Sequence, residues 1–145
     1  MAPIVRPDIH TPFHIDFGWF EQNGRDLREE MYDALCEECR ALYPSPAEKR
    51  LVDRVDPETA RVMRVDALWE CLADHCGQKP GFITPATPLT TAIFRALLAN
   101  ENRPLTPEQL HRRIGKSNPN SILRVLMGAQ IENGIVPAEG DGKQV

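Results

Sequence analysis

The sequence predicts a mainly α-helical protein with one small β-hairpin, and three observations support this. Apolar residues recur at helical spacing in several segments, and one stretch rich in β-branched residues alternates on both sides of a turn. Near the C-terminus, two segments that begin with capping residues and proline flank a glycine. We therefore expect N-terminal helices with the hairpin over residues 1–84, followed by a three-helix domain over residues 85–145.

The composition is that of a globular protein, since 41% of the 145 residues are hydrophobic and 26% are charged. The sequence has no run of about 18 apolar residues, and its N-terminus lacks the basic and apolar regions of a signal peptide. The expected location is therefore the cytoplasm, without membrane contact. The reducing conditions there disfavour disulfides among the four cysteines.

A long helix is expected from Asp16 to about Tyr43, either continuous or interrupted at Asn23-Gly24. Pro44-Ser45-Pro46 ends it, because proline cannot donate a helical hydrogen bond and restricts the residue before it. Residues 1–16, rich in proline and histidine, are expected to lie extended against the rest. The apolar residues of the helix share one face at a period of 3.6: Leu27, Met31, Leu35 and Leu42.

The middle of the chain changes to a strand-like pattern. Residues 51–56 and 61–66 are rich in β-branched side chains and flank a turn, so a β-hairpin is expected. A hairpin is marginal in water by itself and must pack on a neighbouring helix. Asp66 is placed to cap a helix from Ala67 to about Cys76, and residues 82–88 are expected to link the two halves of the chain.

Three helices are expected in the C-terminal domain, the first opened by Thr87 or Pro88 and running to about Asn100 with a wide apolar face. The second helix opens with a capping box between Thr106 and Gln109, and Pro107 occupies its first position. Gly115 supplies the left-handed residue that ends this helix. The pattern is that of two short helices joined by a tight turn.

The third helix begins at residues 117–118, either of which can cap it, and its end is open between two alternatives. A helix that stops at Gly128 leaves a hairpin around Asn133-Gly134. A helix that continues to Glu132 leaves a single strand over residues 135–137. The second alternative is the preferred one.

Residues 88–138 resemble the winged-helix branch of the helix-turn-helix superfamily. The resemblance rests on the order helix, capped helix, glycine turn, capped helix and then Gly134-Ile135-Val136. It implies a winged-helix-like domain with a reduced wing, because residues 139–145 are too few and too polar for a return strand. It also implies that the third helix enters the major groove of DNA. The expected DNA contacts are Arg112 and Arg113 at phosphates, with Lys116, Ser117, Asn118, Asn120, Ser121 and Arg124 at the third helix.

The charge distribution agrees with this implication. Residues 1–85 hold 10 Lys and Arg against 16 Asp and Glu, whereas residues 103–124 hold 5 basic residues against the single acidic residue Glu108. A local excess of positive charge is what the phosphates of nucleic acid attract.

Two groups of cysteine and histidine residues predict a metal site. Tetrahedral zinc takes four sulfur or nitrogen ligands, and two helices that present such groups can hold one ion between them. The alternative is that these thiols are reduced and fill the core, because free cysteine is among the most buried residue types. The expected ligands of one structural zinc ion are Cys36, Cys39, His75 and Cys76, with Cys71 as an alternate.

The sequence contains neither a glycine-rich phosphate-binding motif nor a Gly-x-Ser-x-Gly nucleophile turn, so we expect no enzymatic activity and no small-molecule substrate. The expected function is that of a DNA-binding accessory protein or transcriptional regulator. The N-terminal half is then expected to mediate self-association or to bind a protein partner. The alternative is a protein–protein adaptor that uses the same C-terminal domain without DNA.

Overall fold

The computed structural model describes residues 6–42, 50–128 and 134–138 of the chain. Over these ranges the protein forms seven α-helices, one short 3-10 helix and two two-stranded antiparallel sheets, which confirms the helix-rich fold class. Each helix within them is too short or too polar to cross a membrane. The elements are β1 (Phe13–Ile15), α1 (Phe17–Gln22), α2 (Leu27–Asp33), α3 (Glu37–Leu42), β2 (Leu51–Val55), β3 (Val62–Asp66), α4 (Ala67–Asp74), the 3-10 helix η1 (Cys76–Gln78), α5 (Leu89–Ala99), α6 (Pro107–Ile114), α7 (Pro119–Gly128) and β4 (Ile135–Pro137).

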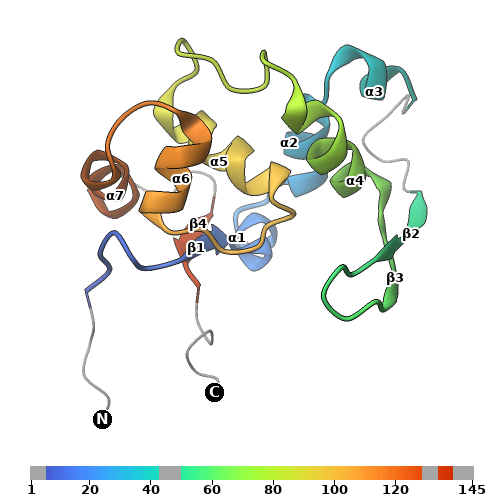
Figure 1. The fold of residues 1–145 in the computed structure, drawn as a ribbon, viewed down its shortest axis with the longest axis horizontal. Coiled ribbons are helices and arrows are strands. Elements are labelled where there is room, and N and C mark those ends of the chain that lie inside the picture. Colours follow the sequence, from blue (N-terminus) through green and yellow to red (C-terminus); the bar gives the residue numbers. More distant parts are fainter. Residues whose placement is uncertain (1–5, 43–49, 129–133, 139–145) are drawn as a thin grey trace.

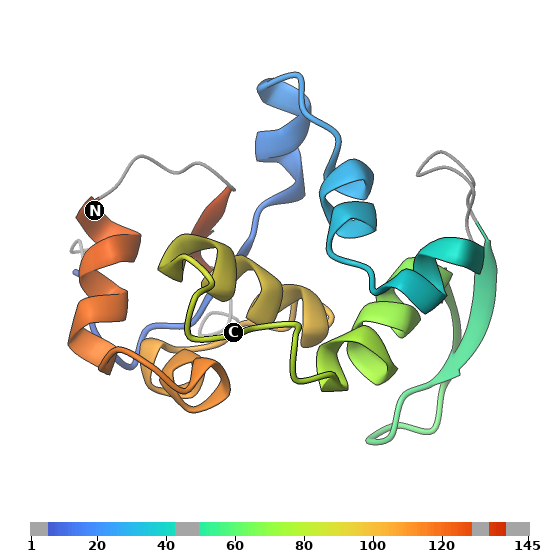
Figure 2. The ribbon, with the colours of Figure 1, turned by 90° about the horizontal axis from the view of Figure 1, so that it is seen from above.

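The molecule is elongated, and its two ends carry different elements. Helix α7 lies at one end of the long axis and the β2–β3 hairpin lies at the other, with α5 and α4 between them (Figures 1 and 2). One cluster of buried side chains extends through both halves of the chain. It includes Leu68 and Leu72 of α4, Ile93 and Leu97 of α5, Leu110 of α6 and Ile122 of α7.

The helix predicted between Asp16 and Tyr43 is interrupted at Asn23-Gly24, as one of the two alternatives held, and it has a second break after Asp33 that was not predicted, so the described part of this segment forms α1, α2 and α3. Gly24 adopts a left-handed φ of 64°, and the Asp26 side chain accepts from the N–H of Arg28 and starts α2. A second break follows α2, where the N–H of Cys36 donates to Cys76 Sγ at 3.3 Å instead of to a carbonyl of its own helix. The predicted apolar face is buried at Met31 and Leu35 but 57% exposed at Leu42.

The predicted hairpin is confirmed as β2 and β3, and one arginine ties it to the rest of the molecule. The guanidinium of Arg54 donates to both carboxylate oxygens of Asp74 on α4, at 2.9 and 3.2 Å, and also to Glu101 after α5. Asp66 caps α4 as predicted, by accepting from the N–H of Leu68 at 3.1 Å. Helix α4 ends at Asp74, before the predicted Cys76, and a 3-10 turn follows.

The predicted caps of the C-terminal helices are confirmed. The N–H of Gln109 donates to Thr106 Oγ1 at 3.1 Å, and the N–H of Thr106 donates to Gln109 Oε1 at 2.9 Å. Gly115 ends α6 with a φ of 81°. Asn118 caps α7, because its Oδ1 accepts from the N–H of Ser121 at 2.8 Å. Helix α7 is described as far as Gly128, and the choice between the two predicted exits concerns residues 129–133, which lie outside the described residues.

The sequence predicted an extended N-terminal segment but not strand β1 within it. It pairs with β4 in antiparallel register, His14 opposite Val136, so the predicted strand over residues 135–137 has a partner. Phe13 also exchanges two backbone hydrogen bonds with Leu105, at 2.8 and 3.0 Å. Strand β1 therefore lies between β4 and Leu105, which comes just before the N-cap of α6.

The side chain of Asn102 holds β1 in this position. The N–H of Ile15 donates to Asn102 Oδ1 at 2.7 Å, and Asn102 Nδ2 donates to the carbonyl of Ile15 at 3.0 Å. Asn102 also adopts a φ of 58°, where asparagine is tolerated better than most residues. We expect Asn102→Ala to lower the free energy of unfolding by about 2–3 kcal/mol, because two part-buried hydrogen bonds are lost from a strained backbone position.

Urea denaturation measures this loss. Gln22→Ala, at an exposed position of α1, is the control, and its free energy of unfolding is expected to stay within about 0.5 kcal/mol of the wild type. Equal midpoints and slopes for Asn102→Ala and the wild type would contradict the role given to Asn102.

Candidate metal centre and candidate nucleic-acid interface

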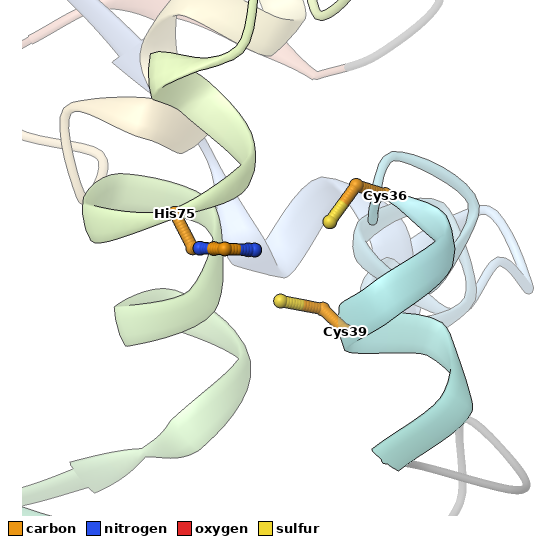
Figure 3. Close-up of side chains that lie close together, drawn as sticks. All are labelled: Cys36, Cys39 and His75. Atoms are coloured by element: carbon orange, nitrogen blue, oxygen red, sulfur yellow. The ribbon is translucent and has the colours of Figure 1, made fainter.

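Cys36, Cys39 and His75 lie close together where α3 faces the end of α4. Their ligand atoms all lie within 4.8 Å of one another. Figure 3 shows the imidazole of His75 pointing toward the gap between the two thiols. Cys39 is buried, Cys36 is partly buried and His75 is exposed, so the group lies at the edge of the core. Three of the four predicted ligands thus form a compact group that could hold a metal ion.

The fourth predicted ligand, Cys76, lies beside this group but is not one of the three residues whose ligand atoms all lie within 4.8 Å of one another. Cys76 Sγ lies 3.6 Å from Cys36 Sγ. Sulfur ligands of a tetrahedral zinc ion with bonds of about 2.3 Å lie about 3.8 Å apart, so this pair has the spacing that zinc requires. The alternate ligand Cys71 is half-buried and lies against Cys39.

The thiols of Cys36, Cys39 and Cys76 differ in their pKa values. Burial acts to raise the pKa of the Cys36 thiol, but the N–H of Cys39, the neighbouring thiols and the charge of Lys79 outweigh it and lower this pKa to about 7. Burial raises the pKa of both Cys39 and Cys76. Metal binding requires thiolates, so the ion would displace protons from these two thiols and would bind more tightly as the pH rises.

A carboxylate and an ammonium group surround the ligands, and sequence reasoning missed both. Glu38 Oε1 lies 3.0 Å from His75 Nε2 and also accepts from the ammonium of Lys79. These two partners lower the pKa of Glu38, first through the hydrogen bond from Lys79 and then through that from His75. A carboxylate on the ring nitrogen that does not bind the metal is the usual second partner of a metal-bound histidine, so with Glu38 on Nε2 the ring would bind an ion through Nδ1. Glu38 lies inside the Cys-x-x-Cys sequence itself, which is the signal that could have identified it.

Three exposed arginines lie on α6 and α7, the two helices on either side of Gly115. Arg112 and Arg113 lie in the last turn of α6, and Arg124 lies on α7. All three side chains are exposed. Within residues 6–42, 50–128 and 134–138, no carboxylate lies within ion-pair distance of any of them. We call Arg112, Arg113 and Arg124 the basic surface.

The other predicted DNA contacts are placed differently from one another. Ser117, Asn118 and Asn120 are exposed at the start of α7, and Ser121 is half-buried. Lys116 instead turns toward the segment between the two halves, where its ammonium donates to the carbonyl of Pro85 at 2.9 Å and to that of Thr87.

Comparison of the chain with protein-family models, with curated proteins and with solved structures finds no match.

Proposed function

We propose that this protein is a DNA-binding accessory protein or transcriptional regulator of winged-helix type that acts by binding and not by catalysis. The observation that carries the proposal is the basic surface. Exposed guanidinium groups without a carboxylate partner are suited to phosphate contacts, because no existing ion pair has to be broken. Their position on the two helices that flank the Gly115 turn is the position expected for a helix-turn-helix.

The arrangement of the short strands supports the same proposal. The helices α5, α6 and α7 follow one another in the order of a winged helix, and β1 pairs with both Leu105 and β4. Strand β1 therefore occupies the place in which the return strand of a wing would pair. In the proposed winged helix, a segment from the N-terminal part of the chain would thus supply this strand.

The start of α7 offers the chemistry that base recognition needs. Asparagine can pair with adenine, and arginine with guanine, in the major groove. The Oδ1 of Asn118 is engaged in the cap of α7, which leaves its Nδ2 as a donor, whereas Asn120 is free of such a role. We assign phosphate contacts to Arg112 and Arg113 and base-edge contacts to Asn118, Asn120 and Arg124.

Fluorescence anisotropy with a random-sequence DNA duplex, titrated at several salt concentrations, tests the proposal. Affinity is expected to fall linearly with the logarithm of salt concentration, with a slope of about −0.9 for each phosphate that is contacted. Absence of binding at about 20 mM salt would reject DNA as the partner, because electrostatic affinity is greatest there.

The alternative function is a protein–protein adaptor, and one feature of α7 favours it. Leu123 and Met127 line an open hollow of about 460 Å³ together with Arg6 and Arg124, and Met127 is 47% exposed. Exposed apolar side chains on this surface suit a protein partner better than phosphates. Loss of DNA binding in the anisotropy experiment would favour this adaptor.

The proposed metal is one structural zinc ion bound by Cys36, Cys39, His75 and Cys76. Thiolate and imidazole groups are the ligands that zinc prefers. Cys36 and Cys39 come from the start of α3, and His75 and Cys76 come from the junction of α4 and η1. The ammonium of Lys79 lies close to Cys36 and Cys76 and would offset part of the negative charge of three thiolates. Reduced thiols without metal remain the alternative that elemental analysis of the purified protein distinguishes.

Glu38 provides a test of this site that leaves the ligands unchanged. We expect Glu38→Gln to weaken zinc affinity by about 10–100-fold, because the hydrogen bond that orients His75 loses its charge. Competition with a chromogenic chelator measures the affinity. Glu37→Gln, the exposed neighbour at the start of α3, is the matched control and is expected to bind zinc as the wild type does. Equal affinities for both variants would remove Glu38 from the site.

A further inference from the structure

The outer face of the β2–β3 hairpin is apolar at one end and charged at its centre. The register pairs Val55 with Val62 and Asp53 with Arg64, and directly opposite residues point to the same side of a sheet. The inner face, which carries Arg54, is the one that meets α4. We call Leu51, Asp53, Val55, Val62 and Arg64 the outer hairpin face.

The side chains of this face are left in solvent by the rest of the described chain. The exposed fractions of Leu51, Val55 and Val62 are 48%, 58% and 64%. The outer hairpin face holds three of the seven large hydrophobic side chains that are exposed in residues 6–42, 50–128 and 134–138, and Met63, opposite Arg54, lies on the inner face. Such a concentration of exposed apolar groups marks an interaction surface.

The charges of the face identify its partner as a second copy of this chain. Arg64 Nε lies 3.3 Å from Asp53 Oδ1 in the middle pair of the hairpin, and both side chains are about two-thirds exposed. A two-fold axis parallel to the strands places β2 of one copy over β3 of the other. Asp53 then faces Arg64 of the second copy, and Val55 faces its Val62. A patch that contains both halves of each contact is what a symmetric dimer requires.

We propose that the protein forms a symmetric homodimer in which two outer hairpin faces pack against each other. This deepens the proposed function, because it assigns the self-association expected of the N-terminal half to five residues. The hairpin lies at the opposite end of the molecule from α7 (Figures 1 and 2), so the dimer leaves both basic surfaces free. Two strands offer a small interface, and we expect a dissociation constant of about 1–100 μM.

Sedimentation of the full chain without DNA tests the dimer separately from DNA binding. The wild type is expected to change from 16.3 kDa to twice this mass as concentration rises. Val62→Glu is expected to raise the dissociation constant by at least about tenfold, because it buries a charge against Val55. Leu42→Glu, an exposed apolar position on α3 outside the hairpin, is the matched control and should dimerise as the wild type does.

A charge exchange tests the predicted pairing directly. Asp53→Arg alone opposes two positive charges across the axis and should weaken the dimer by about tenfold. The double variant Asp53→Arg with Arg64→Asp restores opposite charges and should recover dimerisation, with circular dichroism confirming that each variant is folded. A wild type that remains monomeric, a control that dissociates like Val62→Glu, or a double variant no better than the single one would each overturn the proposal. Failure of DNA binding would leave these results unaffected.

Discussion

Removal of zinc with a chelator is expected to lower the melting temperature of the protein by about 12 °C. A ligand present at about 1,000 times its dissociation constant stabilises the folded state by about 4 kcal/mol. For a chain of this size, each kcal/mol corresponds to roughly 3 °C. The loss should begin in the N-terminal half, because the ion would join α3 to the end of α4. Calorimetry with and without chelator measures the change, and added zinc should reverse it.

Single cysteine substitutions make this expectation specific. Cys39→Ser should have a low melting temperature that the chelator no longer changes, since its buried sulfur is then lost as a ligand. Cys76→Ser and Cys71→Ser form a matched pair, of which only Cys76→Ser should reduce the zinc content. Protein that contains no zinc and melts at the same temperature with or without chelator would contradict the site and favour reduced core thiols.

Replacement of Arg112, Arg113 and Arg124 by alanine is expected to abolish DNA binding at moderate salt. Each charged contact with a phosphate or a base edge contributes at least about 1 kcal/mol, so the triple variant should lose affinity by at least about 100-fold. The salt dependence is also expected to become shallower, by about one unit of slope for each phosphate contact removed. Anisotropy titrations at several salt concentrations measure both quantities.

A control substitution that removes the same charge elsewhere distinguishes the effect of the basic surface on DNA affinity from that of net charge. Arg61→Ala removes one exposed arginine at the turn of the hairpin, at the opposite end of the molecule from α7. We expect Arg124→Ala to weaken binding and Arg61→Ala to leave it unchanged within about twofold, as short-range contacts require. An equal effect of the two substitutions would show that only the overall charge matters.

The local signals of the C-terminal helices were sufficient to predict them. The Thr106–Gln109 capping box and the left-handed Gly115 depend on neighbours within a few residues, and the structure contains both. The Asp66 cap and the β2–β3 hairpin are equally local. Such interactions can be predicted from the sequence because the groups that make them are close along the chain.

The features that the sequence did not predict depend on interactions between distant parts of the chain. The end of α2 has no proline or glycine nearby, and the bond from Cys36 N–H to the Cys76 sulfur that accompanies it joins residues 40 positions apart. Strand β1 is only three residues long and is positioned by Leu105, Asn102 and β4. A three-residue strand has no periodicity from which it could be recognised.

Sequence spacing predicted three of the residues that lie together at the candidate metal site, but not their surroundings. These residues are Cys36, Cys39 and His75. The contributions of Glu38 and Lys79 depend on how α3 faces the end of α4, which no local pattern encodes. The hydrogen bonds of the Lys116 ammonium to two main-chain carbonyls were not predicted either, since they join residues 31 and 29 positions apart.

The position of β1 has a consequence for how the protein is made. Residues 13–15 leave the ribosome long before residues 135–137, yet the small sheet needs both. Strand β1 therefore cannot pair with β4 until residues 135–137 have been synthesised, and Phe13 and Ile15 stay uncovered until then. A shortened gene that starts at residue 85 would encode every helix of the C-terminal half and still produce a protein in which β4 has lost its partner strand.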